Sequence, residues 1–147
     1  MFHKHDARVQ KLASVSLFSS CTQSELRELA GITTEIEAPS GTVFCREGAT
    51  GNDCFVVVDG EAAVTIAGEH LCTIEPGGFF GEMALLDGGP RVATVTASSD
   101  MRLLVMSRQE FASLLTRVPS VSRRMLAAVG ARLRLAESQL HPAHVGI

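Results

Sequence analysis

The sequence contains no tryptophan and no tyrosine, and its aromatic side chains are limited to seven phenylalanines and the histidines. It also lacks any apolar run that approaches the roughly 20 residues needed to cross a bilayer. The N-terminus, MFHKHDARVQ, is polar and has no apolar segment of the kind found in secretory signal peptides. These absences predict a cytoplasmic protein that does not associate with a membrane.

Catalytic and metal-binding patterns are missing as well. The four cysteines show no Cys-x-x-Cys spacing, and we interpret them as small apolar residues rather than redox or metal ligands. All histidines except His70 lie near the ends of the chain, where histidines are usually solvated. No combination of nucleophile, base and orienting group stands out. The sequence therefore predicts no enzyme active site.

What the chain has is the composition of one globular domain. Its 147 residues suffice for a single core and are short for two domains. Hydrophobic residues make up 46% and charged residues 20% of the sequence, which excludes an intrinsically disordered chain.

The order of the predicted elements is helix, strands, then helices. Thr22 and Glu25 have the spacing of a capping box and predict a short helix that ends at Gly31. From about residue 33 to residue 105, short runs rich in Val, Ile, Thr and Phe alternate with turn residues. Many short strands with tight turns favour a β-barrel or jelly roll. The fold class is thus mainly β with flanking helices.

Two further helices are predicted at the C-terminal end. Ser107 and Glu110 form a second capping box, and Pro119 opens a longer helix. One face of this longer helix carries a stripe of apolar residues. Three packing partners for this stripe remain open: its own barrel, a second subunit, or a ligand that the helix covers as a lid. A homodimer and an unidentified effector protein therefore both remain open as partners. The apolar residues of the stripe are Val121, Met125, Val129, Leu133, Ala136 and Leu140.

The stretch from Phe79 to Val95, FFGEMALLDGGPRVATV, places one glutamate and one arginine inside an otherwise apolar and glycine-rich segment. Residues 76–78, Pro-Gly-Gly, interrupt the preceding strand pattern and allow the backbone to approach a ligand closely. Residues 82–86 are predicted to form a single helical turn, whose first N–H groups are unpaired and favour an anion. Arg91 follows after a turn, so this arginine and Glu82 can contact one ligand from two sides.

The chemistry of these two side chains indicates the kind of ligand. The carboxylate of Glu82 only accepts hydrogen bonds, which suits ribose hydroxyls and not a phosphate. The guanidinium of Arg91 is a permanently charged fork that matches two phosphate oxygens. The segment therefore predicts a site for a ribose and a phosphate that lie close together. Two other interpretations remain, namely a solvated surface pair and an internal ion pair between Glu82 and Arg91.

The pattern F-G-E-x-A-L-L followed by P-R-x-A-T-V resembles the phosphate-binding cassette of cyclic nucleotide-binding domains. This family is shared by the regulatory subunits of cAMP-dependent kinase and the bacterial catabolite activator. Gly41, Gly48 and Gly60 also stand where the family has tight turns. The resemblance implies a double-stranded β-helix, or jelly-roll barrel, with N-terminal helices and two C-terminal helices.

The resemblance also implies the extent of the domain. It covers roughly residues 12–140, nearly the whole chain. The expected parts are a polar tail at 1–11, a β-barrel at about 33–105, C-terminal helices at about 107–140, and a tail at 141–147.

Site residues follow from the same resemblance. It makes Glu82 the acceptor of the ribose 2′-hydroxyl and Arg91 the partner of the cyclic phosphate. Contacts from the cassette backbone are expected from Gly81, Met83, Ala84, Val92 and Ala93. Strand residues expected to pack on sugar and base are Val64, Leu71 and Cys72.

Base selection rests on Val92. Guanine-selective members of the family commonly carry a threonine directly after the phosphate arginine, so valine there favours cAMP over cGMP. The last helix offers Glu137 as an acceptor for the adenine amino group, although such a glutamate is usually just solvated. No Trp or Tyr is available to stack on the base. No cofactor or metal is expected besides the cyclic nucleotide.

The function expected from the resemblance is a cAMP sensor whose C-terminal helices move when the ligand binds. One alternative is a nucleotide-free scaffold of the same fold. Another is a metal-dependent cupin, for which His70 is the only candidate ligand that looks interior. Arginines of the last helices form a basic face, but no helix-turn-helix follows them, so this chain alone is not expected to bind nucleic acid.

Overall fold

The computed structural model describes residues 4–140, and the side chains of residues 9–134 among them. The strands are β1 (Thr34–Ala38), β2 (Val43–Cys45), β3 (Asp53–Asp59), β4 (Ala62–Ile66), β5 (Glu69–Ile74), β6 (Phe79–Phe80), β7 (Thr94–Ala97) and β8 (Met101–Ser107). The helices are α1 (Lys4–Ala13), the 3-10 turn η1 (Ser16–Phe18), α2 (Gln23–Ile32), α3 (Glu82–Asp87), α4 (Arg108–Arg117) and α5 (Pro119–Leu140).

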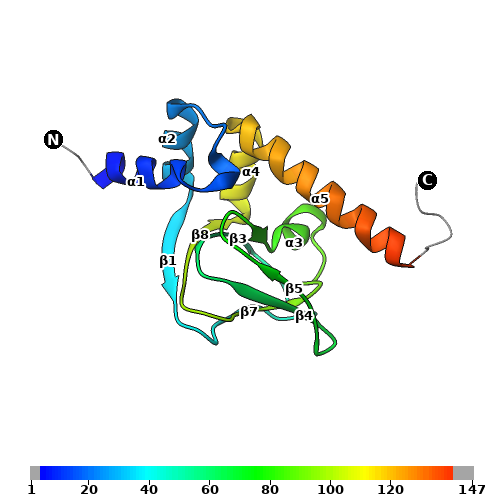
Figure 1. The fold of residues 1–147 in the computed structure, drawn as a ribbon. Coiled ribbons are helices and arrows are strands. Elements are labelled where there is room, and N and C mark those ends of the chain that lie inside the picture. The colour runs from blue at the N-terminus through cyan, green and yellow to red at the C-terminus, as the bar shows by residue number, and fades with distance from the viewer. Residues whose placement is uncertain (1–3, 141–147) are drawn as a thin grey trace.

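Two antiparallel sheets form the body of the domain, and helices from both ends of the chain flank them (Figure 1). One sheet has the strand order β1-β8-β3-β6 and the other the order β2-β7-β4-β5. The prediction of a mainly β domain with flanking helices is confirmed. In the described part of the chain, the strands pair into these two sheets and do not close into one barrel.

The sheet that contains β3 and β8 is the middle layer of the domain. Leu104 and Met106 on one face of β8 pack with the helices, whereas Met101 and Leu103 on the other face pack with the second sheet. Strands that are buried on both faces have continuous apolar sequences, which explains the run LLVM at residues 103–106 of β8. Burying each such large side chain stabilises the fold by about 1.5–3 kcal/mol. This layer gives the rest of the domain a rigid support.

Both predicted capping boxes are present. The hydroxyl of Thr22 accepts from the backbone N–H of Glu25 at 3.1 Å, and the carboxylate of Glu25 accepts from the N–H of Thr22 at 3.0 Å. Ser107 and Glu110 repeat this arrangement at the start of α4. However, α2 continues through Gly31 to Ile32, so the prediction that it ends at Gly31 is wrong. Gly31 lacks the left-handed backbone of a terminating glycine.

The structure differs from the sequence expectations at both ends. The segment expected as a polar tail contains α1, whose Val9 is 4% exposed and packs in the core. The expected stripe on α5 is buried at Val121 and Met125, but Leu133 further along is 56% exposed. The structural reason is that α5 packs on the domain with its first turns and then runs out past α3 (Figure 1). No helix within residues 4–140 meets the length and hydropathy that membrane crossing requires.

We predict that Gly60→Ala lowers the free energy of unfolding by about 1–3 kcal/mol. Gly60 turns the chain between β3 and β4 with φ +85°, and an added Cβ would lie 2.3 Å from the backbone oxygen of Asp100. Urea denaturation followed by circular dichroism measures the effect. The matched control is Gly31→Ala, because an added Cβ there has nothing within 4 Å and alanine favours a helix. Equal destabilisation by both changes would contradict the role of Gly60.

Candidate ligand-binding site

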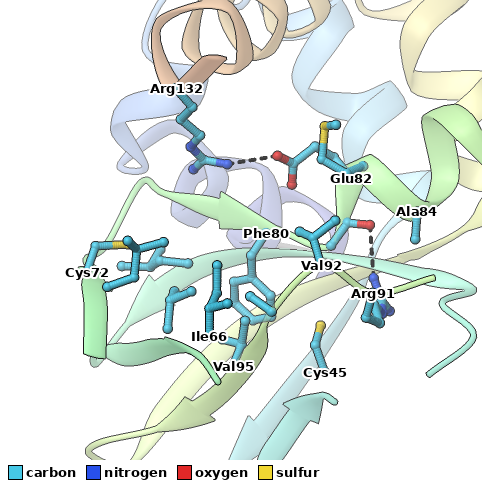
Figure 2. A pocket seen from close by; sticks show the side chains of 16 residues that line it. Cys45, Ile66, Cys72, Phe80, Glu82, Ala84, Arg91, Val92, Val95 and Arg132 are labelled. Carbon is cyan, nitrogen blue, oxygen red and sulfur yellow. Dashed lines mark hydrogen bonds and ion pairs between the residues drawn. The ribbon is translucent and has the colours of Figure 1, made fainter. Parts of the chain in front are cut away.

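The segment between β6 and β7 forms one wall of a cavity of about 190 Å³ (Figure 2). It contains α3, which begins directly after Gly81 and ends before Gly88. The predicted single helical turn is thus present in the structure. Strands β4, β5 and β7 of the second sheet provide the opposite wall. The cavity therefore lies between this segment and the second sheet, and Phe80 of β6 also lines it.

Arg91 is held at one end of this cavity and is only 8% exposed. Its Nη1 donates to the backbone oxygen of Gly81 and its Nη2 to that of Asp53, both at 2.9 Å. Both partners are neutral carbonyls, and no ion pair to Arg91 is formed among the described side chains. A buried guanidinium with only neutral partners keeps its positive charge available for an anion.

Glu82 lies at the start of α3 and is 4% exposed. Its Oε1 accepts a hydrogen bond from Nη1 of Arg132 at 2.8 Å, and the two groups form an ion pair (Figure 2). Arg132 also donates from Nη2 to the oxygen of Phe79 at 2.9 Å, and its guanidinium lies 4.7 Å from the centre of the Phe79 ring. The alternative of an internal ion pair between Glu82 and Arg91 is therefore wrong. Glu82 is paired with α5 instead.

Burial raises the pKa of Glu82 above its ordinary value. The hydrogen bond from its own backbone N–H, the charge and hydrogen bond of Arg132, and the charge of Arg91 oppose this rise. The carboxylate therefore depends on nearby donors to remain charged. A ligand hydroxyl that donates to it would stabilise the charged form further.

Apart from Glu137, all residues predicted for the site line this cavity. They are Val64, Leu71, Cys72, Gly81, Glu82, Met83, Ala84, Arg91, Val92 and Ala93. Glu137 lies on α5, but its side chain is outside the described residues. The structure thus places these residues around one cavity. Their contacts with a ligand remain predictions.

Other lining residues are absent from the sequence prediction. They are Cys45, Ile66, Ile74, Phe80, Val95 and Arg132. Phe80 stacks on Phe55 with ring centres 4.9 Å apart and forms part of the apolar wall. Strand alternation could have indicated that Val95 shares a face with Ala93. For Arg132 the sequence carries no signal, since its partner lies far away along the chain.

The cavity has one charged end and one apolar side. Val92 and Leu71 at its rim are 60% and 57% exposed, so they extend the apolar lining of the cavity to the surface. A planar apolar group can lie against this rim while a polar group contacts Glu82 and Arg91. Figure 2 shows Val92 between the two charged residues.

The alternative of a metal-dependent enzyme loses its candidate ligand. His70 is exposed on β5, the edge strand of the second sheet, so the expectation that it faces the interior is wrong. Within the residues that the structure describes, no three His, Cys, Asp or Glu side chains gather to hold a metal ion.

Comparison with known proteins gives consistent results. The family model described as "Cyclic nucleotide-binding domain" matches residues 35–118, more than half of the chain. The chain belongs to the cyclic nucleotide-binding domain family. The resemblance noted from the sequence is therefore confirmed.

Individual relatives of this cyclic nucleotide-binding domain are longer proteins. A cyclic nucleotide-gated potassium channel of Rhizobium etli is 34% identical over 77% of this chain and 32% of the channel. A cAMP-dependent protein kinase regulatory subunit of Hypocrea atroviridis is 35% identical over 77% of this chain and 24% of the subunit. The chain thus spans a third or less of these relatives. The crystal structure of the Thermus thermophilus catabolite activator protein matches with a TM-score of 0.76 and 29% identity, over 86% of this chain and 62% of that chain.

We predict that Arg132→Ala raises the pKa of Glu82, because it removes the positive charge and hydrogen bond that oppose the effect of burial. Carbon-detected NMR of the Glu82 carboxyl during a pH titration measures this. Arg134→Ala is the matched control, because Arg134 lies on the same helix and is exposed. An unchanged titration of Glu82 in Arg132→Ala would show that the ion pair does not form in solution.

Proposed function

We propose that this chain is a regulatory module that binds cAMP and couples its occupancy to movement of the C-terminal helices. The observation that carries the proposal is the placement of a buried carboxylate and a buried guanidinium on one cavity with an apolar side. Glu82 and Arg91 are 4% and 8% exposed, and the two hydrogen bonds of the Arg91 guanidinium go to neutral carbonyls. A cyclic nucleotide has the matching groups, namely ribose hydroxyl, phosphate and base.

In this proposal each part of the ligand has a partner. The phosphate contacts Arg91, whose two hydrogen bonds to carbonyls fix the guanidinium and leave further N–H groups for an anion. The ribose 2′-hydroxyl donates to Glu82. The base lies against the apolar rim, where Val64, Leu71 and Val92 line the cavity.

The strand orders support a jelly-roll interpretation of the domain. Strands β1, β3, β6 and β8 lie in one sheet, and β2, β4, β5 and β7 in the other. An eight-stranded double sheet with such crossings is typical of jelly rolls. We therefore infer a jelly roll of two open sheets, in which the crossing from β6 to β7 carries the ligand contacts.

In this proposal, Arg132 couples occupancy of the cavity to movement of the C-terminal helix α5. Its ion pair with Glu82 links α5 to the proposed ribose acceptor, so a hydroxyl that reaches Glu82 also meets Arg132. A ligand shifts α5 only if it binds one arrangement of this pair more tightly than another. The regulatory and gating names of the relatives support a role of this kind.

The partner of α5 would be a second copy of this chain or an effector protein. Leu126 and Leu133 on α5 are each 56% exposed, which favours a contact of this helix with another protein. The same exposed leucines fit a nucleotide-free scaffold, the alternative function. Intact Glu82 and Arg91 favour the sensor.

Titration calorimetry with cAMP tests the proposal. Arg91→Ala should weaken binding by roughly 2–5 kcal/mol, because it leaves the phosphate charge without its partner. This is about thirty-fold to several-thousand-fold in affinity. Glu82→Gln should weaken binding less, since an amide oxygen still accepts from a hydroxyl. Equal losses from both changes would contradict the assigned roles, and no saturable binding by the folded wild-type chain would favour the scaffold.

Val92→Thr should raise the affinity for cGMP relative to cAMP. Val92 is 60% exposed at the rim of the cavity, so a hydroxyl placed there can reach a guanine without repacking the core. Competition between the two nucleotides, measured on wild type and variant, gives the ratio. A ratio that stays the same would refute Val92 as the determinant of base selection.

A further inference from the structure

Arg108, the first residue of α4, connects the two backbone segments that hold the charged residues of the cavity. Its Nη1 donates to the oxygen of Leu85 at 3.1 Å, and its Nη2 donates to the oxygens of Gly51 at 3.1 Å and Ala84 at 3.4 Å. Leu85 and Ala84 belong to α3, while Gly51 precedes β3. One planar guanidinium on α4 therefore joins two segments, α3 and the Gly51 segment, that are distant in the sequence.

The Gly51 segment is in direct contact with Arg91. A Cβ added at Gly51 would lie 2.5 Å from Nε and 2.6 Å from Cζ of Arg91, so the bare backbone forms the wall behind the guanidinium. The same segment continues to Asp53, whose carbonyl accepts from Arg91 at 2.9 Å. Any shift of this segment therefore moves Arg91.

The second support of Arg91 is α3. Gly81 at the start of this helix accepts from Nη1 of Arg91 at 2.9 Å, and Glu82 follows it directly. Arg108 holds the other end of α3, where the last carbonyls of a helix lack partners within the helix and a cation is favourable. Both supports of Arg91 are thus tied to Arg108.

The position of Arg108 within its own helix is otherwise unfavourable. A positive charge in the first turn of a helix opposes the helix dipole, and α4 is already capped by Ser107 and Glu110. Its contacts to the three carbonyls therefore account for an arginine at this position. Lysine could not replace it, because a single ammonium does not span two segments as a planar fork does.

We infer that Arg108 is a positioning residue for the anion end of the cavity: it holds the Gly51 segment and α3 so that Arg91 points at the phosphate. The inference rests on the proposed function, because the anion is the phosphate of the cyclic nucleotide. Arg108 itself does not line the cavity and acts on the ligand only through Arg91 and its supports.

A double-mutant cycle on the full chain tests the inference. Calorimetry with cAMP is carried out on wild type, Arg108→Ala, Arg91→Ala and the double variant. We expect Arg108→Ala to weaken binding by about ten-fold and to have little further effect once Arg91 is absent. Additive losses, or wild-type affinity in a folded Arg108→Ala chain, would overturn the inference.

Two further variants separate positioning from general stability. Arg117→Ala is the matched control, because Arg117 also lies on α4 but is exposed and forms an ion pair with Glu28 at 3.8 Å. This variant should keep wild-type affinity. Arg108→Lys keeps the positive charge and replaces Arg108→Ala as the test variant if Arg108→Ala does not fold. It should lose affinity similarly, and wild-type affinity in this variant would refute a requirement for the planar fork.

A ligand-free measurement makes this test independent of the proposed function. The Nε–Hε signal of Arg91, assigned from its absence in Arg91→Lys, should shift and broaden in Arg108→Ala and stay unchanged in Arg117→Ala. If wild type fails to bind cAMP, the proposed function fails, while this signal still decides whether Arg108 positions Arg91. An unchanged signal in Arg108→Ala would overturn the inference even if cAMP binds.

Discussion

The constraint on which the site depends is the burial of the Arg91 charge, which has no carboxylate partner among the side chains that the structure describes. A buried charge is costly unless hydrogen bonds satisfy it, and here the carbonyls of Gly81 and Asp53 do so at 2.9 Å. For these carbonyls to converge, α3 and the start of β3 must be held side by side. The bare backbone of Gly51 and the fork of Arg108 meet this requirement. The local structure around the cavity is thus organised to present one positive charge.

The layers of the domain explain why the cavity lies where it does. Sheet β1-β8-β3-β6 is covered by helices on one side and by the second sheet on the other, so its interior is fully packed and rigid. The second sheet packs on this layer through residues such as Val64, Ile74 and Val95, and the same three residues line the cavity. Exposed apolar residues such as Leu71 and Val92 occur there. The packed core between the two sheets is therefore continuous with the wall of the cavity.

The ion pair between Glu82 on α3 and Arg132 on α5 is only partly buried. The ion pair of Glu82 and Arg132 joins a side chain that is 5% exposed to one that is 46% exposed. Solvent screens such a pair more than a fully buried one, whereas the Arg132 contact with the Phe79 ring adds to it. Among its described side chains, α5 is otherwise anchored by its first half, through Val121, Met125 and the half-buried Val129, so a contact of this kind can be exchanged without unfolding the core. The proposed movement of α5 requires this property.

The sequence by itself determined the features that depend on neighbouring residues. Capping boxes such as Thr22 with Glu25, the strand-rich middle of the chain, and the segment that carries Glu82 and Arg91 are all visible within a few positions, because helix caps and turns form over short distances. Tertiary structure alone decided that Glu82 pairs with Arg132 and not Arg91, and that His70 faces solvent from an edge strand. These outcomes depend on which strand becomes an edge and where α5 crosses α3. Packing of distant segments sets both, and no local pattern encodes them.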